Sequence, residues 1–292
     1  MAADTIITRL IGGLGNQLFQ YAAARALALR HGASVKLDLT GFEAYGLRRY
    51  ELGNYPIAAQ VARAEEIAAI VRPVPAGIFA RIMTRLQGPL PSHYREPHFH
   101  YDEGLARQKL PLYMDGYWQS DRYFADAADI LRRDLSPLDP LEPENARVAE
   151  LIRSCSAVSL HVRRGDYVTN SHTNAYHGVC SLDYYRTAVA HVCAALPEAH
   201  FFIFSDDHDW TRTNLDLGYP ATFVEANPPD RGFRDIQLMS MCHHHVIANS
   251  SFSWWGAWLN PSPNKIVVAP QRWFAGTDKN TDDLIPAGWV RL

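Results

Sequence analysis

The residues with the clearest chemistry lie in the segment SLHVRRGDYV, residues 159–168. Its first residues alternate as in a buried strand, and Arg163, Arg164 and Asp166 then follow around a glycine. An arginine stays charged at physiological pH, and its guanidinium can grip a phosphate through two parallel hydrogen bonds. One carboxylate beside two guanidinium groups leaves a surplus positive charge. We therefore predict that one arginine binds a phosphate and the other pairs with Asp166, the alternative being a surface ion pair only.

Two glycine- or serine-rich segments add uncharged anion-binding groups. In NSSFSWWGAWL (249–259), Asn249, Ser250 and Ser251 begin a predicted helix, and the free N–H groups of a helix start favour an anion. In IGGLGNQ (11–17), Gly13 and Asn16 stand at a similar start, although a tight strand-to-helix turn explains the glycines equally well. This segment has neither the dinucleotide-binding spacing nor the lysine of a P-loop.

Acidic residues follow the predicted strand HFFIFS (200–205). Asp206 and Asp207 can accept from a ribose hydroxyl or from the N–H groups of a guanine, and at least one is expected to cap the next helix. Asp207 and Asp209 also form an Asp-x-Asp pattern, which leaves a metal-dependent sugar transferase as an alternative. The histidines at 243–245 begin a strand, so their side chains diverge and no metal site is predicted there.

The tryptophans and cysteines are interpreted as structural. Trp254 and Trp258 share one face of their helix, which favours a place in the core over a sugar-stacking platform. The cysteines lie far apart, without metal or redox spacing, and are predicted to be reduced thiols. They are Cys155, Cys180, Cys193 and Cys242.

The elements that must position these residues alternate between strand and helix. A strand at 4–10, a glycine turn, a helix ending at Gly32 and a strand at 33–39 begin a parallel α/β sheet. The region from 42 to 130 is broken by prolines, and we expect it to be mostly helical and rich in loops. The acidic, proline-spaced segment DLSPLDPLEPENARV predicts an extended connector near 136–145.

The second half alternates more regularly. Strands are predicted at 157–162, 200–205, 222–226, 243–248 and 265–270, and helices at 181–196 with Ser181 as N-cap, 233–242 and 251–259. We therefore predict two α/β domains, 1–140 and 141–292, facing across a cleft. Ligands of such sheets lie beyond the carboxyl ends of the strands, where the charged residues stand.

The overall composition excludes several classes of protein. Of 292 residues, 47% are hydrophobic and 20% charged, which is typical of a globular protein and not of a disordered one. The net charge of −3 argues against a nucleic-acid partner. The sequence shows no signal peptide and no apolar stretch long enough to span a membrane, so we expect a cytoplasmic protein with at most peripheral membrane contact.

Five blocks in order, GGLGNQLFQYA, HVRRGDY, HGVCSLDYY, FSDD and ANSSFSWWGAWL, resemble the α-1,2-fucosyltransferase family. The resemblance implies a bacterial, metal-independent inverting enzyme that transfers L-fucose from GDP-β-L-fucose without a further cofactor. It implies a GT-B-like fold of two Rossmann-type domains. The C-terminal one would bind GDP-fucose and the N-terminal one, with its irregular helical insert, would lie on the acceptor side.

The resemblance also assigns site residues. Arg163 would bind the β-phosphate, His161 would line the guanine pocket and Asp206 would bind guanine or ribose. The remaining donor-binding residues are predicted to be Gly13, Asn16, Asn249, Ser250, Ser251 and Phe252.

The catalytic residues are predicted to be Arg163 with Asp166 and His177. The last two are candidates for a general base, and Asp166 is the better candidate for orienting an arginine. The partners implied are GDP-fucose and a galactose-terminated oligosaccharide or glycolipid, fucosylated on a 2-hydroxyl. Two further alternatives remain: another inverting fucosyl linkage, and a nucleotide- or glycan-binding protein without catalysis.

Overall fold

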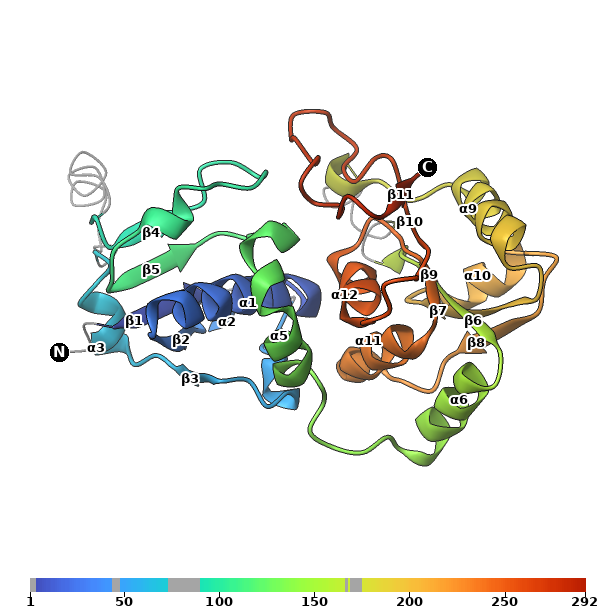
Figure 1. Cartoon of the computed structure of the whole chain (residues 1–292), viewed down its shortest axis with the longest axis horizontal. Helices are drawn as coiled ribbons and strands as arrows, with labels where there is room; N and C mark the ends of the chain where they lie inside the picture. The colour runs from blue at the N-terminus through green and yellow to red at the C-terminus, as the bar shows by residue number, and fades with distance from the viewer. Residues whose placement is uncertain (1–3, 44–47, 73–89, 166–167, 169–174) are drawn as a thin grey trace. The chain divides into compact units, whose positions relative to one another are not determined.

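The computed structural model describes residues 4–43, 48–72, 90–165, 168 and 175–292 (Figure 1). The chain divides into two compact units. Residues 1–135 and 282–284 form the N-terminal unit, and residues 136–281 and 285–292 form the C-terminal unit. Within the described residues, no helix combines the length and apolar content that crossing a membrane requires.

The N-terminal unit is built on a parallel sheet with the strand order β3-β2-β1-β5-β4. Its strands are β1 (Thr5–Arg9), β2 (Ser34–Asp38), β3 (Ala59–Val61), β4 (His93–Arg95) and β5 (Leu112–Asp115). The long helix α1 (Leu14–His31) ends at Gly32, whose φ of 64° is the left-handed conformation that glycine adopts without strain. Shorter helical segments are α2 (Thr40–Glu43), η1 (Leu52–Asn54), α3 (Ala64–Ala68), η2 (Leu105–Arg107), η3 (Asp121–Tyr123), η4 (Ala125–Ala127) and α5 (Ala128–Asp134).

The prediction of a mostly helical region between 42 and 130 is wrong for its strands. β3, β4 and β5 all lie there, and they complete the sheet on both sides of the two predicted strands. β3 and β4 are edge strands of three residues and β5 has four. Such short strands contain too few residues for an alternating pattern to be recognised.

The C-terminal unit has a six-stranded parallel sheet with the order β11-β10-β9-β6-β7-β8. Its elements are α6 (Pro143–Arg153), β6 (Ser156–Val162), α9 (Leu182–Ala195), β7 (Ala199–Ser205), α10 (His208–Asn214), β8 (Ala221–Val224), η5 (Pro229–Arg231), α11 (Gly232–Met241), β9 (His244–Val246), α12 (Ser251–Leu259), β10 (Val267–Ala269) and β11 (Val290–Arg291). Every strand and helix predicted for this half is present, and Ser181 caps α9 by accepting from the Tyr184 N–H. The first residues of α6 lie in the predicted connector, where Pro143 occupies the first turn of the helix, a position that tolerates proline.

Both faces of this sheet are covered by helices, as in a Rossmann-type domain. Val158, Leu160 and Val162 of β6 pack with α9 on one face. Ala157 and neighbouring strands pack with α6 and α11 on the other. Because side chains alternate along a strand, His161 points to the same face as Ala157, toward α11 and α12.

The structural interpretation of the tryptophans is confirmed. Trp254 is fully buried and stacks on the buried Trp258 with ring centroids 6.1 Å apart. The four cysteines are free thiols, as predicted. The three histidines diverge: His243 contacts the Ala157 N–H, His244 the Ile266 N–H, and His245 the Ser159 hydroxyl.

Each sheet has one point at which the strand order reverses. In the N-terminal unit β1 has β2 on one side and β5 on the other, and in the C-terminal unit β6 lies between β7 and β9. In open parallel sheets the crevice beyond the carboxyl ends of the strands at this point is where ligands bind. Ligand-binding residues are therefore expected in the loops after β1 and β5 and in the loops after β6 and β9.

Candidate functional site

The loop after β6 carries Arg163, held by the end of the neighbouring strand β7. Arg163 Nη1 lies 2.9 Å from Asp206 Oδ2, and the two side chains are 20% and 26% exposed. The other oxygen of Asp206 accepts the Arg164 N–H at 2.8 Å. A Cβ on Gly165 would collide with the Asp206 carboxylate, so the glycine permits this close approach. Asp206 thus fixes both the backbone of the loop and the Arg163 guanidinium.

Arg164 makes a different set of contacts. Its Nε lies 3.2 Å from Asp207 Oδ2, and its guanidinium carbon lies 3.5 Å from the centroid of the Trp210 ring. Asp207 caps α10 by accepting the Trp210 N–H at 3.2 Å, which confirms that one aspartate of this pair caps a helix. Arg164 therefore fastens β6 to α10. The predicted partner of the second arginine, Asp166, lies outside the described residues.

His161 is buried next to these arginines, at 4% exposure, with its ring 5.6 Å from that of Phe252. Its Nδ1 has no hydrogen-bond partner among the described residues. Burial lowers the pKa of His161 to about 4, and the opposing charge of Asp206 recovers only part of this shift. The ring is therefore neutral at pH 7, and a buried polar atom of this kind is suited to a bound ligand.

The start of α12 lies at the same edge, because β9, which precedes it, pairs with β6 in parallel. Ser250 is the N-cap, and its hydroxyl accepts the Phe252 N–H at 3.3 Å. Ser251 and Phe252 form the first turn. A helix start presents N–H groups and a partial positive charge to solvent or ligand. Beside Arg163, it makes this edge attractive to an anion.

Asn249 connects the start of α12 to the segment that carries His177. Its buried side-chain amide donates to the carbonyls of His177 at 3.0 Å, Gly178 at 3.3 Å and Trp273 at 3.2 Å. The His177 ring packs against Tyr176 and Phe274. The Asn249 side chain is thus used to position backbone segments.

Gly13 and Asn16 belong to the N-terminal unit. Gly13 is the N-cap of α1, and the Arg48 side chain lies close to it, within 3.8 Å of the place a Cβ would occupy. Asn16 lies in the first turn of α1, and its Oδ1 accepts from Gln119 Nε2 at 2.7 Å. Gly12 has a φ of 80°, and a Cβ there would collide with the Asn16 amide.

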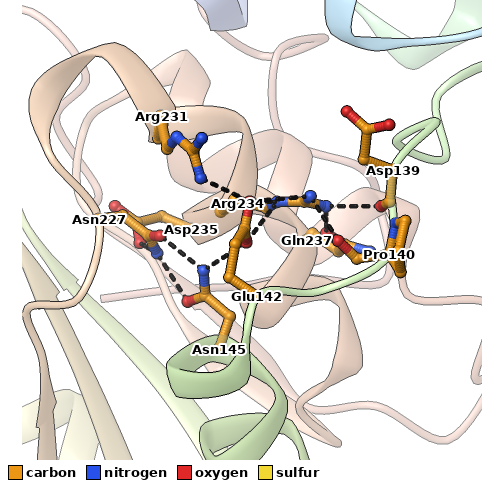
Figure 2. Close-up of polar contacts among 9 residues, drawn as sticks. All are labelled: Asp139, Pro140, Glu142, Asn145, Asn227, Arg231, Arg234, Asp235 and Gln237. Carbon is orange, nitrogen blue, oxygen red and sulfur yellow. Dashed lines mark hydrogen bonds and ion pairs between the residues drawn. The ribbon is translucent and has the colours of Figure 1, made fainter.

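A buried arginine that sequence reasoning missed lies at the start of the C-terminal unit (Figure 2). Arg234 of α11 is 1% exposed and donates to the carbonyls of Asp139 at 3.0 Å and Pro140 at 2.7 Å. It also lies 3.0 Å from the Glu142 carboxylate. An arginine among the apolar residues of RGFRDIQLM was the available signal, since arginine is buried only when it is paired.

A cavity of about 440 Å³ lies beside this cluster. It is lined by Glu142, Pro143, Glu144, Asn145, Ala226, Asn227, Pro228 and Arg231. Burial works to raise the pKa of Glu142, but hydrogen bonds and Arg234 hold it at about 2, so this carboxylate is ionised. Glu142 also pairs with Arg231 at 2.6 Å. Because Arg231 and Arg234 both pair with Glu142 and Glu144 also lines the cavity, it offers a diphosphate no surplus positive charge.

The fold is that of a GT-B-like glycosyltransferase. It is similar to the structure of a mutant of Arabidopsis thaliana FUT1 in complex with GDP, with a TM-score of 0.50 and 10% identity over 91% of this chain and 70% of that one. The predicted GT-B-like fold of two parallel-sheet α/β domains is confirmed.

Sequence comparison gives the family. The profile of glycosyl transferase family 11 matches residues 92–292. The chain is 33% identical to alpha-1,2-colitosyltransferase of Escherichia coli over 98% of each chain. It is 34% identical to O-antigen biosynthesis glycosyltransferase WbnK of Escherichia coli, over 97% of this chain and 99% of that protein. It is 25% identical to human galactoside alpha-(1,2)-fucosyltransferase 1 over 85% of this chain and 63% of the relative. The chain belongs to glycosyl transferase family 11.

Proposed function

We propose that the protein is an inverting transferase that moves L-fucose from GDP-β-L-fucose to the 2-hydroxyl of a galactoside. The observation that supports this most directly is that Arg163 and the start of α12 both follow strands at the strand-order reversal of the C-terminal sheet. A guanidinium and a helix start there can hold a diphosphate between them. The family and the relative named for α-1,2 fucosyl transfer supply the sugar and the linkage.

In this proposal each residue at the carboxyl edge of the sheet has one task. Arg163 binds the β-phosphate, and Asp206 orients it while keeping lone pairs for ribose or guanine. The neutral His161 presents Nδ1 to the guanine base. Ser250, Ser251 and Phe252 bind the diphosphate at the start of α12, where the Ser250 hydroxyl holds the first turn by accepting the Phe252 N–H. Asn249 contributes by fixing the backbone around them. The assignment of Gly13 and Asn16 to donor binding stays a prediction from the sequence.

The chemical step follows from these contacts. The bond between fucose C1 and the β-phosphate oxygen breaks, so positive charge develops on the sugar and negative charge on GDP. Arg163 and the α12 N–H groups stabilise the departing GDP. The acceptor O2 attacks the opposite face of C1 and loses its proton, giving an α-linked product. A preorganised contact of this kind is typically worth about 10²–10³ in rate.

The proton acceptor in the proposal is His177 or Asp166. His177 is held near the start of α12 through its own carbonyl, which accepts from Asn249. Asp166 follows the arginine loop in the sequence. A His177→Gln variant that retains most of the activity would leave Asp166 or solvent as the acceptor of the proton.

A second candidate donor is GDP-colitose. An alpha-1,2-colitosyltransferase is 33% identical to this chain over nearly its full length. Colitose is fucose without its 3-hydroxyl, so the contacts to the diphosphate and the guanine serve either donor. The choice between the two sugars must depend on groups around the sugar ring.

The proposed function is tested with GDP-fucose and GDP-colitose in parallel against an array of galactosides, read by mass spectrometry and linkage analysis. We expect a 1→2-linked fucosyl galactoside, formed equally well in EDTA. Transfer of colitose but not of fucose would identify GDP-colitose as the donor in place of GDP-fucose. Loss of activity in EDTA would favour the metal-dependent alternative. Release of GDP that does not depend on a galactoside, with no product, would contradict the transferase proposal.

A further inference from the structure

The strand-order reversal of the N-terminal sheet has a second built loop, residues 116–119 after β5 (Leu112–Asp115). Trp118 has a φ of 56°, the one left-handed conformation of a non-glycine residue in the described part of the chain. Such a conformation costs on the order of 1–3 kcal/mol and persists only where its surroundings impose it. This strain in a loop at a ligand-binding edge is the starting observation.

Several contacts impose the conformation. The Glu96 carboxylate accepts the Tyr117 N–H at 2.7 Å and the Trp118 N–H at 2.9 Å. The fully buried indole of Trp118 stacks on Tyr94 and meets Tyr123 edge-on. A Cβ on Gly116 would collide with Glu96. The loop is therefore preorganised, and Glu96 is occupied by backbone groups.

The loop is also joined to the loop after β1 (Thr5–Arg9). The buried Gln20 accepts the Ile11 N–H at 3.0 Å and donates to the Gly116 carbonyl at 3.2 Å. Gln119 Nε2 donates to Asn16 Oδ1 at 2.7 Å. β1 and β5 are neighbouring parallel strands, so both loops lie at the carboxyl edge where the order reverses.

The side chains of the 116–119 loop itself carry no charge. Asp115, at the end of β5, is paired with Arg9 at 3.2 Å and with Arg95 at 3.2 Å. The loop itself contributes two amides with Asn16 and the exposed ring of Tyr117. Amides offer both donors and acceptors to hydroxyl groups, and a tyrosine ring offers an apolar face with a polar tip. These are the groups that an uncharged sugar requires.

We infer that residues 116–119, with Tyr117 and Gln119 as the contacting side chains, bind the galactoside acceptor. Tyr117 stacks on the apolar face of the pyranose, and the amide of Gln119, oriented by Asn16, bonds to its hydroxyls. Trp118 and Glu96 position the loop. The identification of the sugar as an acceptor rests on the proposed function; the binding of a neutral pyranoside at this loop does not.

The test uses the full chain with Tyr117→Ala, Gln119→Leu and a matched control, Tyr219→Ala. Tyr219 is 40% exposed, against 38% for Tyr117. It lies just before the amino end of β8, in the C-terminal unit. Initial rates give KM for the galactoside, KM for the GDP-sugar and the rate of donor hydrolysis without acceptor. Saturation-transfer NMR with methyl β-galactoside reports binding directly, and thermal melting confirms folding.

We expect kcat/KM for the galactoside to fall by about tenfold or more in both loop variants. KM for the donor and acceptor-free hydrolysis should stay within about twofold in Tyr117→Ala, and the Tyr219→Ala control should match the unchanged protein. Folded loop variants with unchanged galactoside kinetics and NMR signal would overturn the inference. If neither GDP-sugar is transferred, the proposed function fails, but loss of the NMR signal in the loop variants alone would still support sugar binding at this loop.

Discussion

The two strand-order reversals have the same topology, but the loops after β6 and after β5 carry different side chains. After β6 and β9 the chain places Arg163, Asp206 and a helix start, with a neutral histidine behind them. After β5 it places a tyrosine and an amide, while Asp115 pairs with Arg9 and Glu96 accepts backbone N–H groups. Parallel sheets thus provide equivalent positions, and the loop residues determine which kind of ligand each position is proposed to bind.

The difference also lies in how each loop is held. The arginine loop is fixed by carboxylates that touch its side chains, so the fixing group and the binding group share one charge network. The 116–119 loop is fixed through its backbone by Glu96, which leaves the Tyr117 ring exposed. The first arrangement suits a ligand common to a family, whereas the second allows side chains to change without loss of the loop.

The largest effect is expected for Arg163→Ala. Removing this charge should lower kcat by about 10²–10³ while the melting temperature changes little, since a partly exposed ion pair is worth about 1 kcal/mol or less. Arg164→Ala is the matched control, and it should lower stability more and rate less because it removes the Asp207 pair and the Trp210 stack. An equal loss of kcat in the two variants would contradict the assignment of Arg163 to phosphate binding and of Arg164 to a structural role.

Glu96→Gln tests the 116–119 loop of the N-terminal unit. A glutamine has one acceptor oxygen in place of two, so one of the two N–H groups at Tyr117 and Trp118 loses its partner. Loss of one such bond costs about 1–3 kcal/mol of stability. KM for the galactoside should rise several-fold with KM for the GDP-sugar unchanged. A change in donor KM alone would mean that Glu96 does not act through the sugar-binding loop.

Ser250→Ala tests the start of α12, which is the uncharged part of the proposed diphosphate site. The variant loses the N-cap of α12, at a cost of about 1 kcal/mol in unfolding free energy. Because the first turn is less well ordered, kcat should fall by about tenfold, less than in Arg163→Ala. Ser250→Thr keeps a capping hydroxyl and should restore both values. If Ser250→Thr has normal stability but does not recover kcat, loss of the N-cap is not the cause of the lower kcat in Ser250→Ala.

The smallest effect concerns pH. The folded pKa of His161, about 4, lies below its ordinary value of 6.5, so acid favours the unfolded state that can bind the proton. The stability from this residue is complete above pH 6.5 and is lost as the pH falls toward 4. Between pH 6.5 and 5.5 it should decrease by about 1 kcal/mol. In His161→Gln, the unfolding free energy measured with denaturant should fall by about 1 kcal/mol less over this pH range. The same pH dependence in both proteins would contradict a buried neutral His161.

The parts of the molecule that the sequence predicted are those with long periodic patterns. β6, α9 and α12 were found because seven to fourteen residues repeat a pattern and a serine marks each helix start. The strands at 59–61, 93–95 and 112–115 are set by pairing with β2 and β5 or β1, which no local pattern reports. The proline-spaced connector gave no sign of α6.

The same limit applies to the site. Arg163 stood out because two arginines after a strand are unusual in a nearly neutral chain. The role of Gln119 depends on Asn16, more than a hundred residues away in sequence, and Glu96 acts on the loop only through the fold. Asn249 was predicted from its place before a helix, but its contacts with His177 and Trp273 required the tertiary structure.

The contacts of Arg234 determine how the protein can be dissected. This guanidinium, sealed inside the C-terminal unit, takes the carbonyls of Asp139 and Pro140 as partners (Figure 2). A recombinant fragment that starts at the first helix of the unit, Pro143, would remove the acceptors of Nε and Nη2, Pro140 and Glu142, and would leave Nη1 only Gln237. An expression boundary drawn from secondary structure would therefore yield a destabilised product, whereas one drawn ahead of Asp139 retains the residues that this arginine needs.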